Sequence, residues 1–167
     1  LRIVCARDPE TVRVRPAEQG AEVRDLGKGI LVTVTSPGTW SVEFDGNTWN
    51  NLAIFANPLE EDPPARGAPG VRYYGPGIHL VGGDGTGVLP IEAGDTVYLA
   101  GGSLVYGRID IGRKNDVTIR GRGILCGSKM NHDRRRHRHQ LAYLGNGSRI
   151  TVEGIILLDA PVWNMHL

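Results

Sequence analysis

Residues 73–125 read YYGPGIHLVGGDGTGVLPIEAGDTVYLAGGSLVYGRIDIGRKNDVTIRGRGIL. Short β-type runs at Thr96–Leu99, Ser103–Tyr106 and Asp116–Ile119 alternate with single or paired glycines. None of these runs is long enough, or has the 3.6-residue period, to form a helix. Short strands with turn residues between them at close, recurring spacing are typical of stacked β-coils, which present a long surface to a polymer.

An internal repeat supports the stacking. The run from Val117 to Leu125 aligns position for position with the run from Ile150 to Leu158, and Gly121 falls on Gly154. The polar segment 128–140 lies between the two runs, and without most of it the period falls to about the low twenties, typical of one coil. The interval from position 97 to position 117 agrees with this period. We therefore expect segment 128–140 to be a loop that bulges from one coil, with an ordinary antiparallel β-domain as the alternative.

Composition limits the class of protein. The chain has 167 residues with 24 glycines, 10 prolines and 6% aromatics, and no helical periodicity, so we expect a nearly all-β protein of one domain or two small ones. A formal net charge of +1 argues against a nucleic-acid binder. The longest purely aliphatic run, Ile155–Leu158, is too short for a transmembrane helix, so no membrane partner is expected.

The start of the chain and its cysteines add two expectations. The first residues are not a signal peptide and contain no initiating Met, so we expect a processed or truncated start. Two cysteines, Cys5 and Cys126, make no disulfide framework, and nothing in the sequence favours a bridge between them. Cys126 follows an apolar pair and suits a buried position in a stack.

The chain divides near its proline-rich segment. Residues 1–57 contain two strands around Ser36–Gly38 and a further apolar strand at Leu52–Phe55, with weaker edge-strand signals in residues 7–24. Trp40, Val42 and Phe44 alternate onto one face, and we assign both Trp40 and Trp49 to the core. We expect part of a small β-sandwich at 1–57, a stiff Pro-rich linker at 58–70 and stacked coils at 71–167.

Four phrases in a fixed order resemble a known family. They are Ile54–Glu60, Val71–His79, Gly94–Gly107 and Gly121–Leu125. In this order they resemble the polygalacturonase-type glycoside hydrolases, namely bacterial members of glycoside hydrolase family 28 and their dextranase and isopullulanase relatives. The resemblance covers roughly residues 28–167. It implies an N-terminal β-sandwich followed by the first coils of a right-handed parallel β-helix, the pectin-lyase-like solenoid, in a secreted or periplasmic protein without a cofactor.

The activity implied by the resemblance is inverting hydrolysis of an O-glycosidic bond in a polysaccharide. Such enzymes use an acid and a base about 6.5–9.5 Å apart. The family's Asn-Thr-Asp, Asp-Asp, Gly-His-Gly and Arg-x-Lys motifs are not in this sequence, which ends at Pro161–Leu167 in a stretch that resembles the coil before the first catalytic Asp. We therefore assign no catalytic residue, expect the carboxylates on the remainder of the polypeptide, and give Asp159 a turn role.

The basic run Asn131–Gln140 holds four arginines and three of the five histidines. It is a loop that contacts substrate, a solvated bulge or, less well supported, a nucleic-acid patch. His137 and His139 have a spacing found in metal sites, but no carboxylate or Cys partners support one, so no metal is expected. Trp163 and Tyr143 could stack on sugars, although internal stacking is the usual role in a solenoid. Our candidate substrate-binding residues are Asn131, His132, Arg134, Arg136, His137, Trp163 and His166.

Two other functions compete with a hydrolase. One is a non-catalytic β-helical module that binds carbohydrate or has a structural role. The other is a β-helical polysaccharide lyase, which is disfavoured because the sequence shows no acidic cluster for Ca²⁺.

Overall fold

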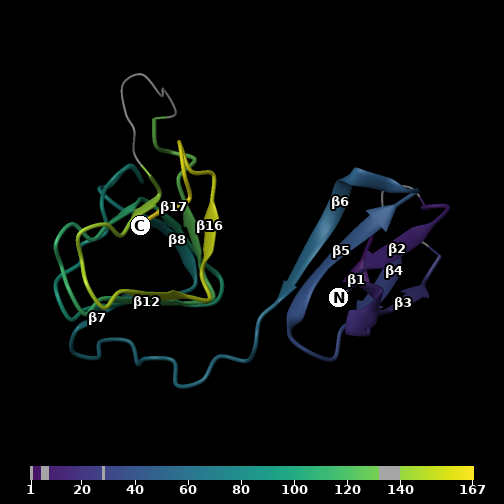
Figure 1. Cartoon of the computed structure of the whole chain (residues 1–167), viewed down its shortest axis with the longest axis horizontal. Helices are drawn as coiled ribbons and strands as arrows, with labels where there is room; N and C mark the ends of the chain where they lie inside the picture. The colour runs from purple at the N-terminus through teal and green to yellow at the C-terminus, as the bar shows by residue number, and fades with distance from the viewer. Residues whose placement is uncertain (1, 5–7, 28, 132–139) are drawn as a thin grey trace. The chain divides into compact units, whose positions relative to one another are not determined.

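The structure is a computed structural model, and it describes residues 2–4, 8–27, 29–131 and 140–167. The chain forms two compact units, Leu1–Leu59 and Glu60–Leu167 (Figure 1). Within the described residues the regular structure is all β apart from the three-residue 3-10 turn η1 (Ala17–Gln19), which bears out the all-β prediction. No helix in these ranges is both long and apolar enough to cross a membrane.

The N-terminal unit contains two antiparallel three-stranded sheets, in the orders β1-β4-β3 and β2-β5-β6. The strands are β1 (Arg2–Ile3), β2 (Val12–Arg15), β3 (Glu22–Asp25), β4 (Ile30–Thr33), β5 (Gly38–Phe44) and β6 (Asn47–Ala56). Both sheets contribute to one buried cluster of Ile30, Val32 and Val42. Segment 7–24 supplies the edge strands β2 and β3, as its weaker signals suggested.

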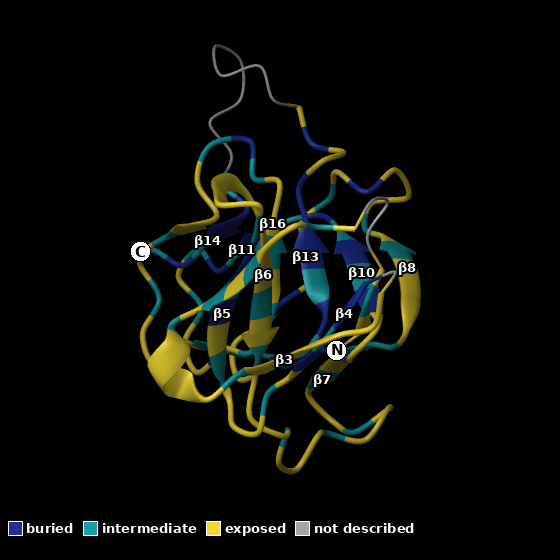
Figure 2. Ribbon diagram, turned by 90° about the vertical axis from the view of Figure 1, so that its right-hand side faces the viewer, coloured by how far each residue is buried: buried dark blue, intermediate teal, exposed yellow. Residues whose placement is uncertain are grey.

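The strands on either side of Ser36–Gly38, β4 and β5, lie in different sheets and do not pair with each other. One detail of this unit differs from the sequence-based expectation. Trp40 is buried as expected, with an exposed fraction of 1%, whereas Trp49 is 97% exposed and is not a core residue. Figure 2 shows how much of β6 is exposed.

The second unit is a stack of coils built from three parallel sheets, which we call the coil stack (Figure 1). The first sheet contains β7 (Val71–Tyr74), β9 (Thr96–Leu99), β12 (Thr118–Gly121) and β15 (Thr151–Glu153). The second contains β8 (Gly77–Leu80), β10 (Ser103–Tyr106), β13 (Ile124–Cys126) and β16 (Ile156–Leu158). The third contains β11 (Ile109–Asp110), β14 (Ala142–Tyr143) and β17 (Met165–His166). Each strand pairs in parallel with the equivalent strand of the next coil, which excludes the antiparallel alternative for this part of the chain.

The register confirms the repeat and corrects one of its periods. Ile119 pairs with Val152, as the alignment of the two runs predicts. In contrast, Val97 pairs with Ile119 and not with Val117, so that coil is slightly longer in the first sheet than the sequence alignment indicated. An error of this size leaves the inward and outward faces unchanged, because side chains alternate with a period of two and the shift is an even number of positions. The sequence pattern therefore could not detect it.

The interior of the coil stack is aliphatic. Val97, Leu99, Val105, Ile119 and Leu125 have no exposed surface or almost none, and they lie in one cluster. Cys126 is buried as its place in the sequence indicated, and its thiol is free. Cys5 lies outside the described residues.

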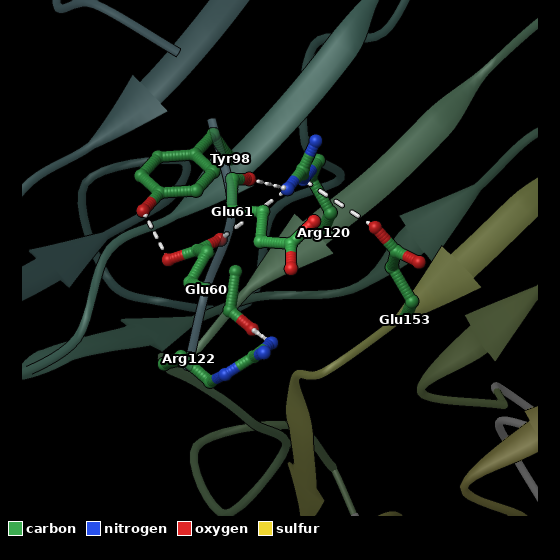
Figure 3. A network of polar contacts seen from close by, with 7 residues as sticks. Glu60, Glu61, Tyr98, Arg120, Arg122 and Glu153 are labelled. Carbon is green, nitrogen blue, oxygen red and sulfur yellow. Dashed lines mark hydrogen bonds and ion pairs between the residues drawn. The ribbon is translucent and has the colours of Figure 1, made fainter. Parts of the chain in front are cut away.

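The proline-rich segment between the units is not a free linker along its whole length. The Tyr98 hydroxyl donates a hydrogen bond to the Glu60 carboxylate at 2.7 Å, and Arg120 donates one to the Glu61 carbonyl at 2.8 Å (Figure 3). Arg120 also lies 3.4 Å from the Glu153 carboxylate. Residues 60–61 are therefore fastened across the outer face of the first sheet. Burial of the phenol, together with the Glu60 carboxylate, raises the pKa of Tyr98 to about 12.

Candidate functional site

The outer face of the third sheet carries a line of side chains that can bind a ligand. Asp110 on β11, Tyr143 on β14 and His166 on β17 occupy matching positions on successive coils. Ile109 and Ala142 precede the first two and are buried. Because side chains on a strand alternate between faces, Asp110, Tyr143 and His166 point outward. We call these three residues, with the adjacent Trp163, the aromatic row.

Ring contacts hold the aromatic row together. The His166 ring lies 5.4 Å from the Tyr143 ring and 5.3 Å from the Trp163 ring, measured between centroids. Both distances are in the range of favourable aromatic contacts. The Trp163 indole is 57% exposed in this coil.

The polar atoms of Tyr143 and His166 have different surroundings. The side-chain amide of Asn146 donates to the Tyr143 hydroxyl at 3.2 Å. The Nδ1 atom of His166 is buried and has no hydrogen-bond partner among the described residues. A buried polar atom without a partner costs free energy.

The acidic end of the row is tied to a cation. Arg108 donates to the Asp110 carboxylate at 3.0 Å, and both side chains are partly exposed. An ion pair of this kind leaves carboxylate and guanidinium edges that can bind neighbouring hydroxyls of one sugar. The ion pair with Arg108 makes Asp110 a candidate positioning or binding group.

Other carboxylates of the coil stack are also engaged, as the described residues show. Asp95 lies 2.9 Å from Arg72, and Arg149 donates to the Asp116 carboxylate at 2.7 Å. Burial opposes the ionised form of Asp95, but the amide of Glu92 and the Arg72 guanidinium outweigh it and lower the pKa of Asp95. Asp159 has a φ of 53°, which fits the predicted turn role. No described cluster of three or more His, Cys, Asp or Glu residues is arranged to hold a metal ion.

The structure brings together two of the residues that the sequence nominated, Trp163 and His166. Asn131 is exposed in the segment between β13 and β14. The remaining nominated residues, namely His132, Arg134, Arg136 and His137, lie outside the described residues. Sequence reasoning noted Tyr143 as an aromatic and missed Asp110 as a member of the site. The signal that would have found Asp110 is the two-residue strand Ile109–Asp110. The register of this strand with residues 142–143 depends on the length of the insertion between them.

Comparison with known proteins agrees with the fold. No family model matches the chain, and no curated protein matches its sequence. Among the solved structures, the chain is similar to Dex49A from Penicillium minioluteum, with a TM-score of 0.61 and 17% sequence identity. The match covers 93% of this chain and 39% of that one, so the chain spans well under half the length of its structural neighbour. At this identity the likeness shows the fold, an all-β architecture with stacked parallel sheets.

Proposed function

We propose that the chain is part of a glycoside hydrolase that acts on a polysaccharide, and that the aromatic row contacts the sugar chain. The observation that carries the proposal is the line of Asp110, Tyr143 and His166 across three coils, with an exposed indole beside it. A row that repeats from coil to coil suits a ligand that is itself a repeating chain. Aromatic faces stack on sugar rings, while carboxylate, imidazole and amide groups bind the hydroxyls.

The structural neighbour supports the same class of substrate. Dex49A is a dextranase, and its likeness to this chain extends over nearly all of the 167 residues. The family 28 resemblance of the sequence points to the same chemistry, the hydrolysis of O-glycosidic bonds with inversion. In our proposal this chain supplies the N-terminal unit and the first coils. The acid and base come from coils that follow these in the same enzyme.

One observation favours a second candidate, a non-catalytic carbohydrate-binding module. Asp95, Asp110, Asp116 and Glu153 all have arginine partners in the coil stack. An inverting mechanism needs one carboxylic acid and one free carboxylate on opposite sides of the bond. None of these four carboxylates is free in that sense, which favours a module that binds sugar without cleaving it.

The finer features of the fold belong to the same proposal. We infer that the two N-terminal sheets form the β-sandwich of the family, since both contribute to the Ile30, Val32 and Val42 cluster. We infer a right-handed winding of the coils because parallel crossovers are right-handed in about 98% of cases. A secreted or periplasmic location follows from the family resemblance.

The proposal can be tested by affinity gel electrophoresis of the 167-residue chain in dextran and in polygalacturonate. We expect retardation by at least one of them, reduced roughly three- to tenfold in binding constant by Trp163→Ala, because a lost aromatic contact is worth about 0.5–1.5 kcal/mol. Ile156→Ala removes an exposed apolar side chain from a neighbouring sheet and is the control. A wild-type chain that neither polymer retards would contradict the proposal.

A reducing-end assay tests the assumption, common to both candidates, that this chain holds no complete acid–base pair. We expect no release of reducing ends from either polymer by the chain alone, because general acid–base help worth about 10²–10⁴-fold is missing. Turnover that Asp159→Asn abolishes would place the catalytic acid in this chain and overturn our assignment.

A further inference from the structure

Strand β6 of the N-terminal unit carries an aromatic side chain in an unusual environment. Trp49 is 97% exposed and Phe55, on the same strand, is 66% exposed. Tryptophan has a large apolar surface, so an exposed tryptophan does not contribute the favourable free energy that its burial would give. Single exposed apolar residues are common, but two aromatics on one strand call for a physical reason.

A backbone irregularity exposes Trp49. The partner of Val42 is Leu52, whereas the partner of Phe44 is Asn47, so β6 has extra residues between these two pairs. Bulges of this kind redirect side chains and are frequent next to functional sites. The extra residues break the alternation that would otherwise assign Trp49 to one face of the sheet.

Side-chain hydrogen bonds hold the irregularity in place. The Asn47 carboxamide oxygen accepts the backbone N–H of Trp49 and that of Asn50, both at 3.0 Å. Further along, the Asn51 side chain donates to the Ser41 hydroxyl at 2.7 Å. The backbone that presents the indole is therefore fixed before any ligand arrives, which lowers the conformational entropy lost on binding.

The chemistry of β6 narrows the class of ligand. The strand reads NTWNNLAIFA, with three asparagines, one threonine and no ionisable residue. An anionic polymer or a phospholipid surface is normally held by Lys and Arg side chains, which β6 does not have. A neutral sugar chain matches what is present, because its ring faces stack on aromatics and its hydroxyls pair with amides.

We propose that β6 is a second carbohydrate-binding site, in which Trp49 stacks on a sugar ring of a neutral polysaccharide and Asn50 and Asn51 bind its hydroxyls. The site is independent of the aromatic row, since all its residues belong to the N-terminal unit. It would hold an enzyme of the proposed class on its polymer without taking part in bond cleavage.

Affinity electrophoresis of the full chain tests the site, with dextran, pullulan and galactan as neutral probes and polygalacturonate as the anionic one. We expect Trp49→Ala to weaken binding to a neutral probe roughly three- to tenfold, and Trp49→Phe to keep most of it. Leu59→Ala is the matched control, because Leu59 is 93% exposed in the same unit but lies outside β6. The fully exposed position of Trp49 means that these variants keep the wild-type melting temperature.

The outcomes separate this site from the aromatic row. Loss of binding with Trp163→Ala but not with Trp49→Ala would overturn the second site and leave the proposed function standing. Loss with Trp49→Ala alone would support the second site and count against the aromatic row. The absence of binding to every neutral probe would also overturn the second site. So would a wild-type dimer, detected by sedimentation, that Trp49→Ala dissociates, because the indole would then belong to an interface between two copies of the chain.

Discussion

The two units of the chain bury different numbers of apolar side chains. Among the described residues, the buried cluster of the N-terminal unit contains three side chains, Ile30, Val32 and Val42, whereas that of the coil stack contains fourteen. Both units are rich in β-branched and aliphatic strands. In the coil stack, the coils that begin at β9, β12 and β15 each have strands of three sheets around one interior, and neighbouring coils cover it. Burial therefore depends on closure of the coil more than on the apolar content of its strands.

The two units also differ in how far apart their paired strands lie in the sequence. In the N-terminal unit β5 and β6 form a hairpin, with only Asp45 and Gly46 between them. In the coil stack, every paired strand comes from a neighbouring coil, as Ile119 and Val152 do, with a whole turn of chain between the partners. Non-local parallel pairs form late and cooperatively, so damage at one coil corner should spread through the stack.

The largest effect is expected at a corner of the coil stack. Gly121 has a φ of 131°, and a Cβ atom there would collide with the carbonyl oxygen of Leu99. That oxygen is fixed because it accepts the N–H groups of Arg122 and Gly123, both at 2.9 Å. We expect Gly121→Ala to lower the free energy of unfolding by more than about 4 kcal/mol, measured by urea denaturation.

Gly94→Ala is the control for this substitution. Gly94 also has a positive φ, of 82°, but nothing lies within 4 Å of its added Cβ. The cost should then be about 1 kcal/mol, the conformational term alone. Equal effects of the two substitutions would show that the corner has room to relax.

Two isoleucines, one from each unit, test how the size of the buried cluster affects the cost of a cavity. Ile119 is fully buried in the coil stack, and Ile30 is almost fully buried in the N-terminal unit. We expect Ile119→Ala to cost close to the upper end of the usual range of about 2–5 kcal/mol and Ile30→Ala close to the lower end. Hydrogen exchange resolves the two units separately. A larger loss of protection from Ile30→Ala would contradict the comparison.

The smallest effect concerns the contact between Tyr98 and Glu60. Because the pKa of Tyr98 is about 12 in the folded chain, against 10.0 for the ordinary phenol, the unfolded chain ionises first as the pH rises. The stabilisation is fully present below pH 10 and is lost between about pH 10 and 12. We expect Tyr98→Phe to flatten this part of the curve of stability against pH. Tyr73→Phe, which keeps the Tyr98–Glu60 bond, should retain the wild-type slope.

The sequence predicted the type of secondary structure better than it predicted which strands pair. Local runs and glycines were enough to predict coils at 96–125, and the pairing of Ile119 with Val152 agrees. The pairing of Val97 was misplaced along the strand, because alternation distinguishes faces and not neighbours. The sequence also left open which sheet each of β4 and β5 joins, since a turn between two strands does not oblige them to pair.

The candidate site shows the same division. Trp163 and His166 were nominated from the sequence, and the structure places their rings in contact. Asp110 was missed because its position opposite Tyr143 depends on an insertion whose length conceals the register. Trp49 was assigned to the core, whereas its side chain is 97% exposed, in a segment where the Asn47 side-chain oxygen accepts the Trp49 backbone N–H.

The amino-acid sequence by itself determined that this chain is all β, that its second part is built from repeated coils and that aliphatic side chains fill their interior. These properties follow from residue type and spacing, which act locally. The tertiary structure decided which strands pair, which indoles stay exposed and which polar side chains meet across coils. Those outcomes depend on the register between segments far apart in the sequence, as between Ile109 and Ala142, and packing of the whole coil selects that register.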